Sequence, residues 1–230
     1  RVLFRSGCVV TAVLAVLVSP WLAIPSGLLA ALWGWVLWFF RDPQRDVPTG
    51  PGCTVAPADG RVTDVTPIGA DGPLGRQAVQ IGIFMSIFDV HVNRSPAAGR
   101  VVGLSHRPGA FLDARDPAAS TRNECMEIRL RLDEPVGTPR PPVGPGADSA
   151  GPACGPDEMI VRQIAGRIAR RVVTDLSEGA TVARGQRIGM IKFGSRAEVV
   201  LPVERAGRVC VRVGQAVRAG QTVLTAGAEE

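Results

Sequence analysis

The longest apolar pattern of the chain runs through residues 7–40, where no charged side chain occurs. Pro20 and Pro25 interrupt it, and each half is shorter than the roughly 20 apolar residues that cross a bilayer as a helix. The whole stretch is longer than one crossing requires. The pattern therefore predicts a helical hairpin that enters one leaflet. A single kinked span is the alternative, and a cleaved signal peptide is a weaker one, because no small-residue cleavage site precedes a polar start.

Basic and aromatic side chains mark the ends of this apolar stretch. Four arginines flank it: Arg1, Arg5, Arg41 and Arg45. Because positive charge is retained on the cytoplasmic side of membranes, both ends are expected at the cytoplasmic face. Three tryptophans near its end suit the membrane interface: Trp33, Trp35 and Trp38. We predict that residues 1–45 form a membrane-associated helical segment and that the protein is a peripheral or monotopic protein of the cell membrane.

The pattern changes in residues 46–230, which we predict to form one β domain. Short runs rich in β-branched residues, such as "QAVQIGIFM" and "CMEIRLRL", alternate with glycine turns, and no long helical pattern separates them. Such spacing favours a mostly β fold, either a flattened barrel or a sandwich. Residues 134–157 are so rich in proline and glycine that we predict a flexible loop there.

A weak repeat occurs in the last quarter of the chain. The segments "EGATVARGQRIGMIKFG" and "VGQAVRAGQTVLTAG" share the spacing G-x-x-V-x-x-G-Q, and three turns share the step G-R-V. Glycine-punctuated hairpins of this kind resemble the flattened β barrels of lipoyl and biotinyl carrier domains. The alternative is that the spacing reflects only a common tight turn.

The net charge and the cysteine pattern limit the binding partners and metal sites that we expect. The net charge is +5, and arginine supplies it, since lysine occurs only at Lys192. Such a charge favours an anionic membrane surface or an anionic head group. The arginines are scattered without a basic and aromatic cluster, so we expect no nucleic acid partner. The five cysteines form neither a C-x-x-C pair nor a zinc spacing with the two histidines, so we predict free thiols and no metal site.

Three residues could together activate a hydroxyl group. Asp59 lies in "APADGRV", His91 in "FDVHVNRSP" and Ser195 in "KFGSRAEV". Taken singly, each is more often an ordinary turn or packed residue. Taken together, they supply an orienting carboxylate, a base and a nucleophile, which is the arrangement that activates serine. Ser195 lacks the G-x-S-x-G elbow of hydrolases, so its target has to be another carbonyl.

The residue before Ser195 indicates that target. Gly194 has no Cβ, so the serine hydroxyl can reach the Gly194 carbonyl and the backbone can adopt the strained dihedral angles that this attack needs. The attack would form an ester, and β-elimination followed by hydrolysis would split the chain at Gly194–Ser195. Ser195 would then remain as an N-terminal pyruvoyl group. The alternative is that the glycine marks only a kink between two strands.

Five motifs occur in a specific order: "FFRDP", "PADG", "FDVHVNRSP", "PGAF" and "FGS". In this order they resemble phosphatidylserine decarboxylase in its short, pyruvoyl-dependent form, over residues 39–224. The resemblance implies that the β domain is catalytic and that the chain is a proenzyme. It would cut itself into residues 1–194 and 195–230, which stay together as a heterodimer, and a higher oligomer remains open.

The resemblance also implies roles for individual residues. Ser195 would become the pyruvoyl cofactor, and Asp59 would belong to the relay of self-cleavage. His91 would return a proton to the substrate during decarboxylation. Longer relatives carry a second histidine where Arg94 stands here, so either His91 serves both steps or His106 contributes.

The implied reaction converts phosphatidylserine in the bilayer to phosphatidylethanolamine, a step of phospholipid biosynthesis. The substrate amine would form a Schiff base with the pyruvoyl ketone, which draws electrons away as CO2 leaves. Arg94 and Arg196 would pair with the carboxylate or the phosphodiester of the substrate. Two alternatives remain: the ether-lipid analogue archaetidylserine as substrate, and a membrane-tethered lipoyl-like carrier or adaptor. A carrier needs an exposed lysine, whereas Lys192 lies in an apolar run.

Overall fold

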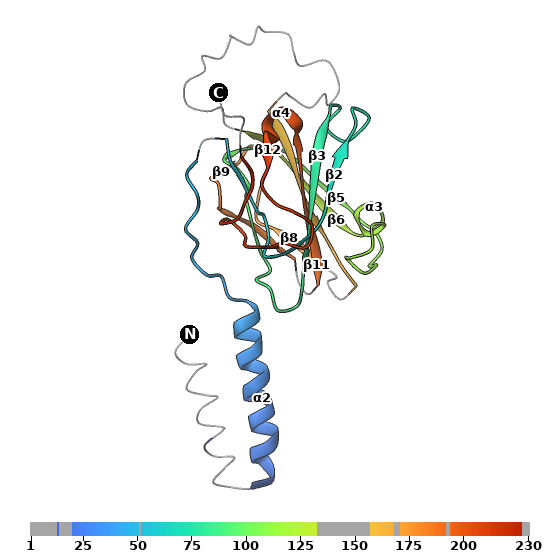
Figure 1. Ribbon diagram of the computed structural model, residues 1–230. Coiled ribbons are helices and arrows are strands. Elements are labelled where there is room, and N and C mark those ends of the chain that lie inside the picture. The colour runs from blue at the N-terminus through green and yellow to red at the C-terminus, as the bar shows by residue number, and fades with distance from the viewer. Residues whose placement is uncertain are drawn as a thin grey trace. The chain divides into compact units, whose positions relative to one another are not determined.

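The structure is a computed structural model that describes Val13 and residues 20–50, 52–132, 157–167, 171–191 and 194–226. Contacts divide the chain into two units, Arg1–Arg41 and Asp42–Glu230. A helix is described in the first unit and mainly strands in the second (Figure 1). The loop predicted over residues 134–157 lies outside the described residues except for Asp157.

The described helix of the first unit is α2 (Pro20–Phe39), which carries no charged side chain. It begins at Pro20, where proline costs no helical hydrogen bond, and it continues through Pro25. The prediction that Pro25 interrupts the apolar stretch is therefore wrong. Proline removes one backbone hydrogen bond early in this helix, and the leucines and alanines that follow favour its continuation.

The Arg41 side chain caps the C-terminal end of α2. The Arg41 guanidinium lies 3.9 Å from the centroid of the Trp38 ring and donates a 2.9 Å hydrogen bond to the Trp38 carbonyl. Within the described residues, no helix is long and apolar enough to span a membrane. The first half of the predicted hairpin lies outside the described residues apart from Val13. The hairpin and the kinked span therefore stay predictions.

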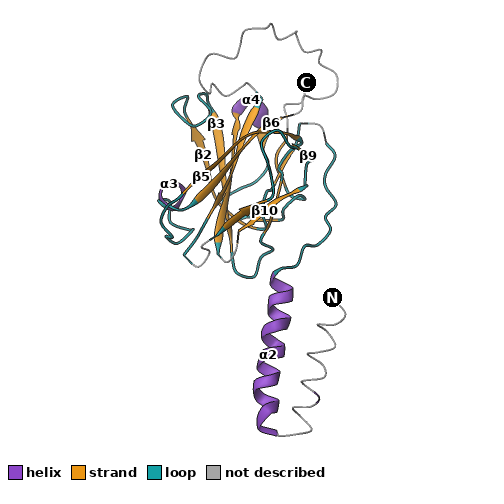
Figure 2. Ribbon diagram, turned by 180° about the vertical axis from the view of Figure 1, so that it is seen from behind, coloured by secondary structure: helices purple, strands orange, loops and turns teal. Residues whose placement is uncertain are grey.

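The second unit is mostly β, as the sequence predicts (Figure 2). Its strands are β1 (Thr54–Val55), β2 (Gly60–Ile68), β3 (Ala78–Met85), β4 (Val92–Arg94), β5 (Gly99–Arg107), β6 (Cys125–Leu132), β7 (Glu158–Ile164), β8 (Val172–Thr174), β9 (Thr181–Val182), β10 (Arg187–Ile191), β11 (Ser195–Pro202), β12 (Arg208–Val209), β13 (Ala216–Val217) and β14 (Val223–Ala226). The described part of this unit also contains two short helices, α3 (Ala119–Arg122) and α4 (Val203–Ala206).

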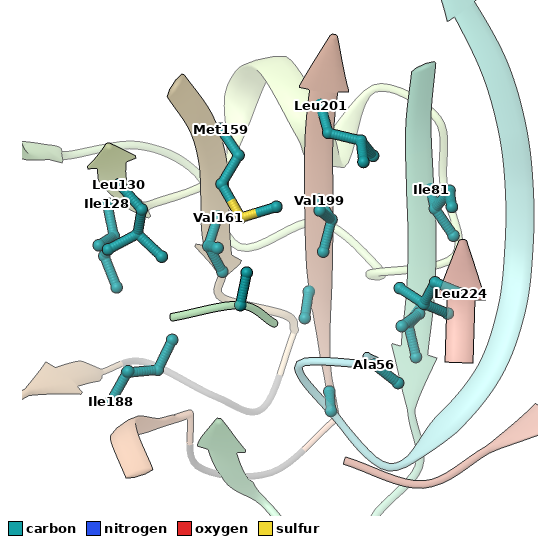
Figure 3. Packing of buried hydrophobic residues seen from close by; sticks show 14 of the residues in the cluster. Ala56, Ile81, Ile128, Leu130, Met159, Val161, Ile188, Val199, Leu201 and Leu224 are labelled. Carbon is teal, nitrogen blue, oxygen red and sulfur yellow. The ribbon is translucent and has the colours of Figure 1, made fainter. Parts of the chain in front are cut away.

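One large antiparallel sheet dominates this unit. Eight of the described strands form it in the order β13-β2-β3-β11-β7-β6-β5-β9, and it curls into a half barrel. Two sheets of three strands, β1-β14-β12 and β4-β10-β8, supply side chains to the same core. Ile81, Val199 and Leu201 of the large sheet share a buried cluster with Leu224 of β14 and Ile188 of β10 (Figure 3). The finer likeness to lipoyl and biotinyl barrels stays a prediction.

The sequence repeat is also a repeat in the structure. Gly179 and Gly185 of the first copy have φ angles of 84° and 76°, and the equivalent Gly214 and Gly220 have 86° and 72°. These angles lie in the left-handed region that favours glycine. The valines between them lie buried in the two edge strands of the large sheet, β9 and β13. The repeated spacing in the sequence therefore corresponds to two equivalent turns, one at each edge strand of the large sheet.

A second sequence repeat lies at the start of strands β2 and β5. Residues 57–62 and 96–101 both read P-A-x-G-R-V. The backbone N–H of Val55 donates to the Pro96 carbonyl at 2.9 Å, and the N–H of Arg94 donates to the Pro57 carbonyl at the same distance. The sheet order is correspondingly symmetric, with β13-β2-β3 on one side of the β11–β7 pair and β9-β5-β6 on the other. The order of the described strands is thus symmetric about the β11–β7 pair at the centre of the sheet.

The central strand β11 is enclosed on both edges and both faces. It pairs with β3, from Ser195 opposite Met85 to Pro202 opposite Ala78, and with β7 on its other edge (Figure 1). Every residue of β11 is buried. Alternate side chains of a strand face opposite sides of the sheet. Ser195 therefore faces the large core together with Ala197 and Val199.

Candidate active site

The Gly194–Ser195 bond lies where the chain enters β11. Gly194 has a φ of 58°, a left-handed conformation that a residue with a Cβ rarely adopts. Ser195 is fully buried, and its hydroxyl donates to the sulfur of Met85 at 3.4 Å. A thioether is a weak acceptor, so this contact holds the hydroxyl only loosely. At the start of β11, the Gly194 backbone can therefore adopt unusual dihedral angles. The Ser195 hydroxyl can rotate away from Met85 at little cost in free energy.

The structure brings His91 to this bond. The backbone N–H of Gly194 donates to His91 Nε2 at 3.3 Å, and His91 Nδ1 lies 2.9 Å from the Asp89 carbonyl oxygen. These two partners fix the tautomer, because an N–H can only meet an unprotonated nitrogen and a carbonyl can only meet a protonated one. His91 is fully buried. An imidazole lone pair therefore points at the residue just before Ser195.

A short turn fixes the position of His91. The Ser86 backbone N–H donates to Asp89 Oδ2 at 2.7 Å, and the Asp89 N–H donates back to the Ser86 carbonyl at 3.1 Å. The flanking valines, Val90 and Val92, are buried with Met190. The D-x-H spacing in the sequence signals this arrangement, since the aspartate closes the turn and its carbonyl orients the histidine two residues later. Sequence reasoning missed that role.

A glycine also packs against the Gly194 carbonyl. A Cβ built on Gly166 would lie 1.9 Å from the Gly194 oxygen and 3.3 Å from the Ala114 Cβ. Only glycine allows this approach. Gly166 was missed at the sequence level, because the "QIAGR" in which it lies reads as an ordinary strand end.

Asp59 lies in the turn before β2 and is engaged from two sides. Its Oδ2 accepts a 2.8 Å ion-paired hydrogen bond from Arg45, and its Oδ1 accepts the Ala219 backbone N–H at 2.8 Å. Arg45 also donates to Gln221 at 3.0 Å. Asp59 therefore connects the segment after Asp42 to the second glycine turn. The group that orients His91 at Nδ1 is the Asp89 carbonyl and not the Asp59 carboxylate.

Arg94 joins two of the sequence motifs. Its guanidinium donates to Asp42 Oδ1 at 2.5 Å and to the Pro43 carbonyl at 3.1 Å, so the arginine of "HVNR" meets the aspartate of "FFRDP". It also donates to the Gly185 carbonyl at 3.0 Å. The Asp42 side chain is 39% exposed, whereas that of Arg94 is only 14% exposed.

Arg196 faces the side of the sheet opposite to Ser195. It donates to Glu198 at 2.7 Å, to Asp64 at 2.6 Å and to Thr63 at 2.9 Å, and its side chain is 4% exposed. A Cβ on Gly82 would lie 2.3 Å from this guanidinium, so a glycine in β3 is needed for the contact. Removing one partner of a buried ion pair costs about 3–5 kcal/mol. The network therefore fixes the start of β11 from its outer face.

The remaining candidates lie elsewhere. His106 Nε2 lies 3.4 Å from Glu124 Oε1, and its side chain is 49% exposed. The described cysteines, Cys53, Cys125 and Cys210, are free thiols. Burial raises the pKa of Cys125 to about 11, which keeps this thiol protonated and unreactive at neutral pH. In the part of the chain that the structure describes, no group of three or more metal-ligating side chains could hold a metal ion.

The chain is similar to known proteins over nearly its whole length. A family model for phosphatidylserine decarboxylase matches residues 32–225. The phosphatidylserine decarboxylase proenzyme of Rhodopirellula baltica is 39% identical over 219 residues, which cover 94% of this chain and 81% of that protein. The proenzyme of Symbiobacterium thermophilum is 40% identical over 96% of this chain and 91% of its own. That of Nitrosomonas eutropha is 40% identical over 96% and 90%.

The site and the comparisons together identify the class of protein and its family. The relatives are proenzymes, and a buried serine that follows a left-handed glycine suits a proenzyme that is cut into subunits. The chain belongs to the phosphatidylserine decarboxylase family. It decarboxylates phosphatidylserine, and its cofactor is a pyruvoyl group that these proenzymes form from a serine by self-cleavage. This sets aside the carrier or adaptor that the sequence left as an alternative.

Proposed function

We propose that Ser195 is the serine that becomes the pyruvoyl group, through a cut between Gly194 and Ser195 that yields residues 1–194 and 195–230. The observation that carries this assignment is the 3.3 Å contact between His91 Nε2 and the Gly194 N–H, at a bond whose serine is buried. The left-handed Gly194 lets the Ser195 hydroxyl turn toward the carbonyl behind it. The residues present therefore suit the formation of this cofactor.

His91 acts as the general base and acid of the site. Its Nε2 lone pair lies beside the bond that reacts, and its Nδ1 proton stays with the Asp89 carbonyl. A base held by a second partner in one tautomer takes a proton from the serine hydroxyl and returns a proton at the same place. Once formed, the pyruvoyl group supplies the electron sink for loss of CO2.

Arg94 binds an anionic group of the substrate by exchange with Asp42. A guanidinium fork suits a carboxylate or a phosphodiester as well as it suits the Asp42 carboxylate. The half-exposed Asp42 is the partner that such a group can replace, while the Gly185 carbonyl keeps the guanidinium in place. Arg196, expected from the sequence to touch the substrate as well, contributes indirectly, because its ion pairs hold the residue next to the cut.

The two fragments remain together after the cut. Residues 195–226 form β11 between β3 and β7, β13 against β2, and β14 beside β1. Their buried side chains belong to the same core as those of the larger fragment. Separation would expose that core and break the ladders on both edges of β11, so the heterodimer is the stable product.

The protein works on a lipid that stays in the bilayer, and phosphatidylserine decarboxylases are membrane-associated. We place the catalytic β domain, residues 46–230, at the cytoplasmic face, with residues 1–45 as its attachment. The exposed leucines and tryptophans of α2 support an apolar attachment of this kind. The hairpin form of the attachment and the flattened-barrel form of the β domain belong to the same proposal.

Replacing Gly166 by alanine should slow self-cleavage by about 100-fold, since displacing a reacting atom by roughly 1 Å has an effect of this size. The added Cβ would collide with the Gly194 oxygen and move the carbonyl that Ser195 attacks. The uncut fraction is measured over time by intact mass. The matched control is Gly103→Ala, where the nearest atom to the new Cβ lies at 3.6 Å. Normal processing of Gly166→Ala would show that the carbonyl position is irrelevant to the cut.

Asp59→Ala should also slow the cut by about 100-fold, because we propose that its carboxylate supports the proton transfer of self-cleavage. Arg45→Ala removes the main ion-pair partner of Asp59 and leaves the carboxylate in place, so a smaller effect is expected. Processing time courses of both variants are compared with that of Asp71→Ala, an exposed loop aspartate. Equal losses for Asp59→Ala and Arg45→Ala would assign Asp59 to anchoring, and normal processing of Asp59→Ala would remove it from the relay.

A further inference from the structure

The turn that carries His91 exposes two large apolar side chains. Ile87 is 36% exposed and Phe88 is 63% exposed, and Phe88 is the bulkiest exposed apolar side chain among the described residues of the second unit. The turn follows β3 and lies at the end of the sheet where β11 begins, at the lower end of the β unit in Figure 1. Exposed apolar surface costs free energy in water in proportion to its area. A partner that covers this tip would therefore bind favourably.

The turn is held rigidly with its tip outward. The Ser86 N–H bonds to Asp89 Oδ2 at 2.7 Å, and the Phe88 N–H bonds to Ser86 Oγ at 3.3 Å. The following residues are tied down by the buried side chains of Val90 and Val92. The hydrogen bonds of the Ser86 and Phe88 N–H groups inside the turn reduce the cost of moving the tip out of water.

The same turn fixes the base of the active site. The Asp89 carbonyl that orients His91 directly follows Phe88 in the chain. Both His91 and Ser195 are fully buried, so a head group that reacts there has to enter the protein. A diacyl lipid that places its serine head beside His91 has its acyl chains outside this buried site, and Phe88 precedes His91 by only three residues.

We propose that Ile87 and Phe88 insert into the boundary between head groups and acyl chains of a phospholipid bilayer and hold the mouth of the active site against the surface that supplies the lipid. This rests on the proposed function. Apolar side chains on a rigid turn enter this boundary readily. A separate contact beside the site adds to the attachment by residues 1–45, because it fixes the orientation of the site rather than only the presence of the protein.

The test compares two substrates. The full chain carrying Ile87→Ser and Phe88→Ser is assayed on phosphatidylserine in phosphatidylcholine vesicles and on monomeric dihexanoyl phosphatidylserine in solution. The ratio of vesicle activity to soluble activity should fall at least tenfold, because burial of either apolar side chain alone accounts for a factor of about ten. Phe88→Leu, which stays apolar, should keep the ratio. Val213→Ser, at an apolar side chain that is 62% exposed on another turn, should keep it as well.

The outcomes separate this proposal from the assignment of Ser195. An unchanged ratio in the double variant would overturn the membrane contact, and if both activities had then fallen equally, the tip would belong to the site itself. A dimer that the double variant loses, with the ratio unchanged, would assign the tip to a second copy of the chain. Intact mass is read on the same samples, and a wild-type chain that is active without the Gly194–Ser195 cut would instead contradict the proposed function.

Discussion

Ser195→Ala should leave the protein as one uncut chain with no measurable decarboxylase activity. The hydroxyl that attacks the Gly194 carbonyl is absent, so no ester forms and no pyruvoyl group arises. The alanine fits the buried site between β3 and β7, where the Ser195 hydroxyl makes a weak 3.4 Å hydrogen bond to the Met85 sulfur. The fold should therefore survive, and the loss should be one of chemistry.

Intact mass and release of CO2 from phosphatidylserine vesicles measure these two effects. The control is Ser105→Ala, an exposed serine of β5, which should be cut and active like the wild type. Release of CO2 by Ser195→Ala, with a chain that stays whole, would show that another group supplies the electron sink.

His91→Ala should reduce self-cleavage by about 10²- to 10⁴-fold, the usual contribution of a positioned general acid or base. The Nε2 lone pair beside Gly194 is lost, and with it the group that can accept the serine proton. The fraction that is still cut should decarboxylate slowly for the same reason. The uncut fraction over time and the activity per cut molecule are measured separately.

The matched control for this variant is His106→Ala. That imidazole is half exposed and lies 3.4 Å from Glu124, so its loss should change either rate less than about twofold, as for most exposed surface side chains. A larger effect from His106→Ala than from His91→Ala would exchange their roles. Normal rates for both variants would show that the base is not a histidine.

The sequence predicted the mostly β fold and its internal repeat for a clear physical reason. Glycines at a fixed spacing around a buried valine demand left-handed turns, and Gly179, Gly185, Gly214 and Gly220 all adopt them. The hydrogen bonds that Val55 and Arg94 donate to the prolines of the two P-A-x-G-R-V segments were not predictable, since they join strands that are far apart in the chain. Pro25 was misjudged, because the helix context outweighs one missing hydrogen bond.

The candidate site was partly predictable. The chemistry that we propose for Gly194 and Ser195 was inferred from their order in the sequence, and the structure places His91 beside Gly194. The direction of Arg196 follows from strand alternation once β11 is known to begin at Ser195, but a strand start is uncertain by a residue or two from sequence alone. The partners of Asp59 and Arg94 belong to tertiary structure, as Arg45 and Asp42 come from the segment that precedes the first strand.

The mass of the purified, active protein tests the origin of the cofactor most directly. We predict two species, residues 1–194 and residues 195–230, with the smaller one lighter by one ammonia than a fragment that begins with serine. A fully active preparation that contains only the intact chain, or a small fragment that keeps an N-terminal serine amine, would contradict the assignment of Ser195.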